Sequence, residues 1–107
     1  MSQCISDMGV FDIKMAQAGE SLMVVFFYAM WSVPCNVIAP IYERLANHYK
    51  DGIFLRVDID EAEVLAKRFE VSIVPSFVFI QGNKIRVLQG GIPGLLQKMI
   101  RDCAAQF

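Results

Sequence analysis

Residues 22–35 constrain the fold more than any other part of the chain. The segment opens with seven consecutive apolar residues, several of them β-branched or aromatic, and no polar residue alternates with them. Such a run is typical of a strand that is covered on both faces, the usual state in parallel sheets. Ser32 and Pro34 follow at positions that favour a helix start, because serine accepts hydrogen bonds from free N–H groups and proline suits the first turn. The sequence therefore predicts a buried strand that leads directly into a helix.

Cys35 falls in the first turn of this predicted helix, next to the end of the strand. Aligned peptide dipoles place about half a positive charge at a helix N-terminus, which favours a thiolate. Two cysteines separated by two residues in such a strand-to-helix setting are a strong redox signal. Here the first position of the pair is Ser32, so the stretch reads Ser-Val-Pro-Cys. The pattern indicates thiol chemistry with one of its two sulfur atoms missing.

The composition predicts a single domain over residues 1–107, because a chain of 107 residues buries one core but is too short for two. The formal net charge of −1, with acidic and basic residues mixed along the chain, gives no electrostatic reason to bind nucleic acid or an anionic membrane. The longest apolar run, residues 22–31, has about half of the roughly 20 residues that span a bilayer. We therefore expect no nucleic-acid partner and no membrane partner.

The N-terminus and the cysteines indicate the compartment. The first residues contain neither the basic cluster nor the apolar core of a secretory signal, so we expect a cytoplasmic protein. Three cysteines, an odd number, favour free thiols over a disulfide framework. Their spacing with His48 matches no metal-site pattern, so we expect no metal and no cofactor. Cys4 is expected to be an exposed reduced thiol near a mobile terminus, and Cys103 a small buried side chain.

Hydrophobic periodicity predicts a succession of helices and strands. Helices are expected over residues 7–18, 34–50 and 61–69. The buried stripe of a last helix is expected to be Leu96, Met99, Ile100 and Cys103. Strands are expected over residues 53–60 and in a hairpin of residues 77–80 and 85–88. This order predicts an α/β fold, with a mixed sheet of four to five strands flanked by four helices.

Two helix details are predicted more finely. Pro40 lies inside the helix over residues 34–50 and is expected to kink it near Asn36 to Val37 rather than to divide it into two helices. The buried stripe of that helix is predicted to be Ile38, Ile41, Leu45 and Tyr49. In the next helix, over residues 61–69, Asp60 is available as the N-cap.

The order of these segments resembles the thioredoxin family. The chain contains, in sequence, FYAMWSVPC, IAPIYERLA, VDID and VSIVPSF, followed by the hairpin and a glycine-containing joint before the last helix. The most specific pieces are Trp31 and the Ile-Val-Pro-Ser stretch of residues 73–76. The resemblance covers nearly the whole chain and implies a thioredoxin fold. It also implies protein thiol–disulfide exchange as part of cell redox homeostasis.

The resemblance implies a role for each matching residue. Cys35 matches the second, resolving cysteine, and Pro34 the proline between the two cysteines. Pro75 matches a cis-proline beside the sulfur atoms, and Gly90 a glycine of the substrate groove. The residues implied in substrate binding are Trp31, Val74, Pro75 and Gly91. Protein thiols or disulfides are the implied partners, with a thioredoxin reductase as a further candidate and a monomer or weak dimer as the expected state.

The departures from the family pattern fall on the chemistry. Ser32 stands where the attacking cysteine is expected, and Phe26 replaces a buried acid that passes a proton to the resolving thiol. Val33 replaces the usual glycine and Asn36 a frequent lysine. A serine hydroxyl without a base beside it does not ionise near pH 7. We therefore expect the chain to be inactive or severely impaired in exchange. Phe26, Pro40 and Gly90 are expected to have structural roles.

Three functional hypotheses remain open on the sequence alone. The first is a thioredoxin-type protein-disulfide oxidoreductase that Ser32 has silenced, whether that serine is natural or was introduced deliberately. The second is a redox-inactive module that binds extended protein segments in the groove around Trp31 and Pro75. The third is a dimer in which a second copy covers Trp31 and the apolar surface beside it.

Overall fold

A computed structural model describes residues 2–105 of the chain. Within this range the elements are, in order, β1 Gln3–Cys4, α1 Met8–Ala18, β2 Leu22–Tyr28, α2 Val33–His48, β3 Ile53–Asp58, α3 Glu63–Arg68, β4 Ser76–Gln81, β5 Lys84–Gln89 and α4 Pro93–Ala104. They form a five-stranded sheet in the order β1-β3-β2-β4-β5. The strands β1, β3 and β2 run parallel, whereas β4 and β5 are antiparallel to their neighbours. The predicted mixed sheet is confirmed.

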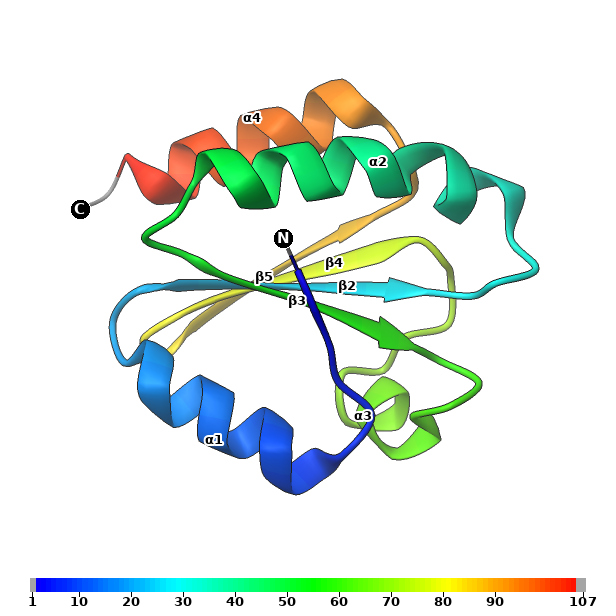
Figure 1. The fold of residues 1–107 in the computed structure, drawn as a ribbon, viewed down its shortest axis with the longest axis horizontal. Helices are drawn as coiled ribbons and strands as arrows, with labels where there is room; N and C mark the ends of the chain where they lie inside the picture. Colours follow the sequence, from blue (N-terminus) through cyan, green and yellow to red (C-terminus); the bar gives the residue numbers. More distant parts are fainter. Residues whose placement is uncertain (1, 106–107) are drawn as a thin grey trace.

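The sheet lies between two pairs of helices (Figure 1), with α2 and α4 over one face and α1 and α3 over the other. Strand β2 is central and pairs with β3 on one side and β4 on the other. Residues alternate between the two faces along a strand, so Val24 and Phe26 pack under α2 and α4 while Val25 and Phe27 pack over α1 and α3. The predicted double-covered strand is therefore confirmed, with its end at Tyr28 leading towards α2.

No strand was predicted near the N-terminus, but Gln3 and Cys4 form β1. Its two residues pair with Leu55 and Arg56 of β3 at the edge of the sheet. Ser2 fixes this edge, since its backbone N–H and hydroxyl both donate to the carboxylate of Glu43 in α2. The guanidinium of Arg56 donates to the Ser2 carbonyl oxygen at 2.7 Å. These contacts place Cys4 in a hydrogen-bonded edge strand, and the expectation of a mobile terminus near Cys4 stays a prediction.

The stripe that α2 buries is rotated relative to the prediction. Ile38 is fully buried as predicted, but the other members, Ile41, Leu45 and Tyr49, are only half-buried. The buried positions of α2 are Cys35, Ile38, Tyr42 and Ala46. The helix ends at His48 rather than at residue 50, and it continues through Pro40. The predicted kink stays a prediction.

Helix α3 begins two residues later than predicted, and Asp60 is not its N-cap. Ala62 occupies the cap position without a side-chain hydrogen bond. The preceding turn is held by Asp58, whose carbonyl oxygen accepts from the N–H groups of Glu61 and Ala62 at 3.2 and 2.9 Å. Asp60 is therefore free to contact another part of the molecule.

Candidate functional site

The N-terminus of α2 is capped by Ser32. Its hydroxyl oxygen accepts a hydrogen bond from the Cys35 N–H at 3.4 Å, and its carbonyl oxygen accepts from the Asn36 N–H at 3.1 Å. The Ser32 N–H donates to Ala29 O at 3.1 Å, so the turn between β2 and α2 is closed by backbone bonds. Pro34 occupies the first turn. The predicted capping role of Ser32 is confirmed, and its side chain is only 6% exposed.

Cys35 lies beneath this turn with 1% of its surface exposed. It belongs to the core between the sheet and the helices α2 and α4, together with Phe26 and Phe77. Those two rings are stacked, with their centroids 4.9 Å apart and an angle of 11° between their planes. Among residues 2–105, the buried polar residues are three serines, so no carboxylate and no imidazole is buried near the thiol. The thiol that the site retains therefore has apolar packing around it rather than a base.

Tyr42 has a polar hydroxyl group within this core, but this hydroxyl points to the sheet. The O–H lies 2.7 Å from Leu55 O and 3.1 Å from Val24 O, both backbone acceptors. Burial raises the pKa of Tyr42 well above its usual value, with the charge of Glu43 as a smaller contribution. A neutral phenol that donates to backbone carbonyls is a structural group. It does not replace the acid that the family pattern implies at Phe26.

The opposite side of the site is made of two loops. The Val74–Pro75 peptide bond is cis, and the Pro75 carbonyl oxygen accepts from the Gly90 N–H at 2.8 Å. Gly90 has a φ of +99°, a conformation that favours glycine. A Cβ atom on Gly91 would lie 3.2 Å from Pro75 Cγ and 3.6 Å from Pro34 O. The structure thus brings Pro34, Pro75 and Gly91 together, although they are far apart in the sequence.

Trp31 lies three residues before Pro34 in the sequence and is 69% exposed. Its indole N–H donates to Asp60 Oδ2 at 2.9 Å, and the Asp60 backbone N–H donates in turn to Asp58 Oδ1 at 2.9 Å. Asp60 is therefore a member of the site that sequence reasoning missed. Its position just before a helical pattern suggested a cap, and no local signal in the sequence links it to Trp31.

Large apolar side chains around these loops face the solvent. We define the exposed rim as five residues, with exposed fractions of 70, 69, 70, 50 and 60%. They are Met30, Trp31, Val33, Ile73 and Ile92. They lie on the three segments that meet where Pro34, Pro75 and Gly91 are in contact. Exposed apolar side chains on neighbouring segments are typical of a site that binds another protein.

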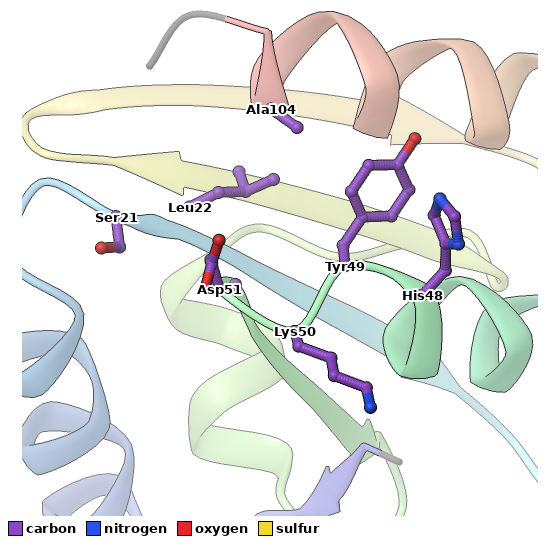
Figure 2. Close-up of a pocket in the computed structure, with 8 residues that line it drawn as sticks. Ser21, Leu22, His48, Tyr49, Lys50, Asp51 and Ala104 are labelled. Atoms are coloured by element: carbon purple, nitrogen blue, oxygen red, sulfur yellow. The ribbon is translucent and has the colours of Figure 1, made fainter.

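The hollow shown in Figure 2 lies at the other end of α2 and has a volume of about 360 Å³. It is lined by Ser21, Leu22, His48, Tyr49, Lys50, Asp51, Gly52 and Ala104. None of the predicted site residues contributes to it. His48 is exposed there and packs edge-on against Tyr49, so the only histidine of the sequence is far along the helix from Ser32.

The other two cysteines lie outside the site. Cys4 is exposed in β1, and Cys103 is buried in α4. Burial raises the pKa of Cys103, an effect that Arg86 partly opposes with its Nη1 4.0 Å from the sulfur. In the described part of the chain, no group of three or more His, Cys, Asp or Glu residues is arranged to hold a metal ion. Within the same residues, no helix has the length and apolar content needed to cross a membrane.

Comparison with known proteins places this site in a family. The family model described as Thioredoxin matches residues 5–102. The chain belongs to the thioredoxin family. It is 39% identical to thioredoxin-1 of Caenorhabditis elegans over 98 residues, which cover 90% of this chain and 85% of that protein. The family is one of thiol–disulfide oxidoreductases, so the general class of chemistry expected from the sequence is supported.

Solved structures confirm the thioredoxin fold. The thioredoxin of Fasciola hepatica matches with a TM-score of 0.91 and 29% identity, covering 94% of this chain and 98% of that one. A chain from a study of thiol resolution in yeast mitochondrial 1-Cys peroxiredoxin via glutathione/thioredoxin systems matches with a TM-score of 0.87 and 28% identity, covering 94% of each. The five-stranded mixed sheet with its four helices is the architecture that the resemblance implied.

Proposed function

We propose that this chain is a thioredoxin-type protein thiol–disulfide oxidoreductase in which Ser32 holds the position of the attacking cysteine. We also propose that the unaltered chain is inactive or severely impaired in exchange. One observation carries the proposal: Ser32 caps α2 directly above Cys35, with its hydroxyl oxygen 3.4 Å from the Cys35 nitrogen. The sequence WSVPC thus stands in place of the two-cysteine motif of the family.

The chemistry of exchange explains why Ser32 has this consequence. A thiolate attacks one sulfur of a disulfide, forms a mixed disulfide and releases the other sulfur as a thiolate. A serine hydroxyl keeps its proton near pH 7 unless a base removes it. In the described chain, the buried polar residues are Ser2, Ser32 and Ser76, so no carboxylate or imidazole is buried below Ser32. The first step therefore has no attacking group at position 32.

Cys35 does not take over the first step, because a disulfide cannot reach it. Its exposed fraction is 1%, and attack requires the nucleophilic sulfur to approach in line with the sulfur–sulfur bond of the substrate. Exchange rates depend on access as well as on the fraction of thiolate. We propose that Cys35 is held in the resolving position without an intermediate to resolve.

The partners we propose are protein thiols or disulfides, with a thioredoxin reductase as a further candidate. Support comes from the family itself and from the matching chain studied with a 1-Cys peroxiredoxin. We further propose that residues 1–107 act as one domain and as a monomer or weak dimer.

Insulin reduction tests the proposal. We expect the unaltered chain to match a Ser32→Ala control, and Ser32→Cys to raise the rate by at least about 100-fold, since removing a nucleophile costs enzymes more than this. Circular dichroism of all three proteins checks that they are folded. Turnover by the unaltered chain well above that of Ser32→Ala would overturn the inactivity, and no turnover by a folded Ser32→Cys would overturn the exchange site.

A second candidate function is a binding module that has lost exchange but keeps the groove around Trp31 and Pro75. The exposed rim favours it, because Trp31 and Val33 are 69 and 70% exposed beside the loop contacts of Pro75. An extended segment at this groove would use backbone hydrogen bonds for affinity and apolar contacts for selection. The partner class is an uncharged, extended protein segment.

Titration with S-alkylated insulin B chain tests this second function. The fluorescence of Trp31, the single tryptophan of the sequence, reports binding directly. A binding module predicts saturable binding that Cys35→Ala leaves unchanged. A binding module also predicts that Val33→Asp, which places a charge on the exposed rim, weakens binding. Absence of a saturable signal from the folded, unaltered chain would remove this second function.

A further inference from the structure

Met30 is the most exposed methionine among residues 2–105, and it adjoins the site. Its side chain is 70% exposed and directly precedes Trp31. The other methionines in residues 2–105 are less accessible: Met23 is 0% exposed, and Met8, Met15 and Met99 are half-buried. Oxidation of a thioether by a peroxide follows its exposure. Among residues 2–105, Met30 is thus the thioether that an oxidant in solution meets most readily.

The segment that carries Met30 is anchored by two hydrogen bonds. The Asn36 side chain donates to the Met30 carbonyl oxygen at 3.3 Å, which ties this residue to the first turns of α2. The next residue, Trp31, donates to Asp60 at 2.9 Å. The backbone that carries the Met30 side chain is therefore held in place at the exposed rim. A change in the polarity of this side chain alters the rim itself.

The sulfur atoms at this end of the molecule differ in access. Cys35 is 1% exposed, and Ser32 contributes an oxygen where the family pattern has a sulfur. We propose that Met30 is an oxidation site for hydroperoxides, and that its sulfoxide weakens binding of a partner's apolar segment at the exposed rim. This inference rests on the proposed function, in which that rim contacts protein substrates. It gives the site a response to oxidants that requires no second cysteine.

Oxidation of Met30 needs no reactant other than the hydroperoxide, which supplies the oxygen atom and accepts the two electrons. The Met30 sulfur attacks the terminal oxygen of the hydroperoxide, so that a sulfur–oxygen bond forms and the oxygen–oxygen bond breaks. The sulfur is oxidised by two electrons, and the peroxide is reduced to an alcohol or, from hydrogen peroxide, to water. The proton of the attacked oxygen passes to the departing oxygen. The product is a polar sulfoxide in place of a flexible apolar side chain.

Peptide mapping by mass spectrometry tests the site. The unaltered chain is treated with dilute hydrogen peroxide, and gain of one oxygen is followed with time at each methionine. We expect Met30 to be oxidised at least five times faster than Met8, Met15, Met23 and Met99. Equal or faster oxidation of any of these four in the folded protein would overturn the assignment.

Steady-state kinetics test the consequence in the Ser32→Cys background. Peroxide is removed with catalase, and dithiothreitol then restores oxidised thiols but leaves the sulfoxide. We expect the KM for insulin to rise at least threefold with kcat little changed. The matched Met30→Leu control has the same cysteines and should keep its KM after peroxide, whereas untreated Met30→Gln should reproduce the rise.

The outcomes separate this inference from the proposed function. Normal insulin turnover with the same KM before and after oxidation of Met30 contradicts the inference alone. A rise in KM that also occurs in Met30→Leu contradicts it as well, because the cause would then lie at another residue. If folded Ser32→Cys reduces no insulin at all, the proposed function is wrong and the inference falls with it.

Discussion

The two sides of the site are held in place by different kinds of contact. Under α2, the site is held by side-chain packing: Phe26, Cys35 and Tyr42 are buried together in the core. On the loop side, the site is held by contacts of the backbone. The Gly90 N–H donates a hydrogen bond to Pro75 O, and Gly91 approaches Pro75 closely. A side-chain environment changes with a single substitution, whereas the shape of the loops persists. We propose that this difference allows the groove to be kept while the groups that would perform exchange are altered.

Phe26→Asp should produce the largest effect on the side-chain half. Phe26 is 2% exposed, with ring centroids 4.9 Å from Phe77 and 5.0 Å from Tyr42. Loss of this packing and burial of an unpaired carboxylate should lower the free energy of unfolding by about 4 kcal/mol at pH 7. Burial raises the pKa of such a carboxyl above its unfolded value, so the loss should shrink as the pH falls towards that raised pKa. Urea denaturation at two pH values measures this.

The matched control is Phe26→Leu, which keeps the position apolar. It should cost about 1 to 2 kcal/mol, and the cost should be the same at both pH values. If Phe26→Asp is as stable as Phe26→Leu at pH 7, the surroundings of Cys35 tolerate a charge, and the contrast between the two halves of the site is wrong.

Tyr42→Phe should have an intermediate effect. It removes the donor to Leu55 O and Val24 O, which should cost about 1 to 2 kcal/mol at neutral pH. Because burial raises the pKa of Tyr42 in the folded protein, its contribution is fully present below the unfolded pKa of about 10. Above that pH the unfolded state ionises first, and stability is lost by up to about 1.4 kcal/mol per pH unit. Tyr42→Phe should lack this loss.

Urea denaturation of both proteins between pH 8 and pH 11 measures the difference. The other tyrosines are present in both, so their titration cancels in the comparison. A constant difference in unfolding free energy across this range would show that the Tyr42 hydroxyl is not protected from ionisation as its burial implies.

Gly91→Ala should have the smallest effect on stability, and it probes the loop half. Its new Cβ would lie 3.2 Å from Pro75 Cγ, whereas a Cβ on Gly94 in α4 meets nothing within 4 Å. Gly94→Ala should stabilise the helix by up to about 1 kcal/mol, and Gly91→Ala should not stabilise the protein. In the Ser32→Cys background, Gly91→Ala should also raise the KM for insulin several-fold. Equal effects of the two substitutions on stability and KM would indicate that Gly91 does not shape the groove.

Local patterns in the sequence predicted the elements that depend on local contacts. The apolar run of β2, the hairpin of β4 and β5 and the serine cap of α2 all follow from residues close to one another in the chain. Strand β1 has only two residues, too few for a periodic pattern. It depends on contacts of Ser2 with Glu43 and Arg56, which no local rule predicts.

The site was predicted less completely, for the same reason. The contact of Pro34, Pro75 and Gly91 is made across long sequence separations, and only the family resemblance pointed to it. Asp60 was assigned to a helix cap because its neighbours fit one, whereas its carboxylate accepts from Trp31. Tyr42, four residues after Ile38 in α2, was missed because Ile41, three residues after Ile38, also fits a helical stripe and is the more hydrophobic residue. Spacings of three and four residues alone do not decide between two adjacent positions.

The reactivity of Cys35 in the folded, unaltered chain tests the central claim most directly. Iodoacetamide is added near neutral pH, and alkylation of Cys4, Cys35 and Cys103 is followed by peptide mapping, with a sample in urea to show that all three react when unfolded. The account predicts that exposed Cys4 is alkylated at least about 100 times faster than Cys35, since alkylation requires access to the thiolate. Alkylation of Cys35 at a rate close to that of Cys4 would contradict it, because the site would then hold an accessible nucleophile.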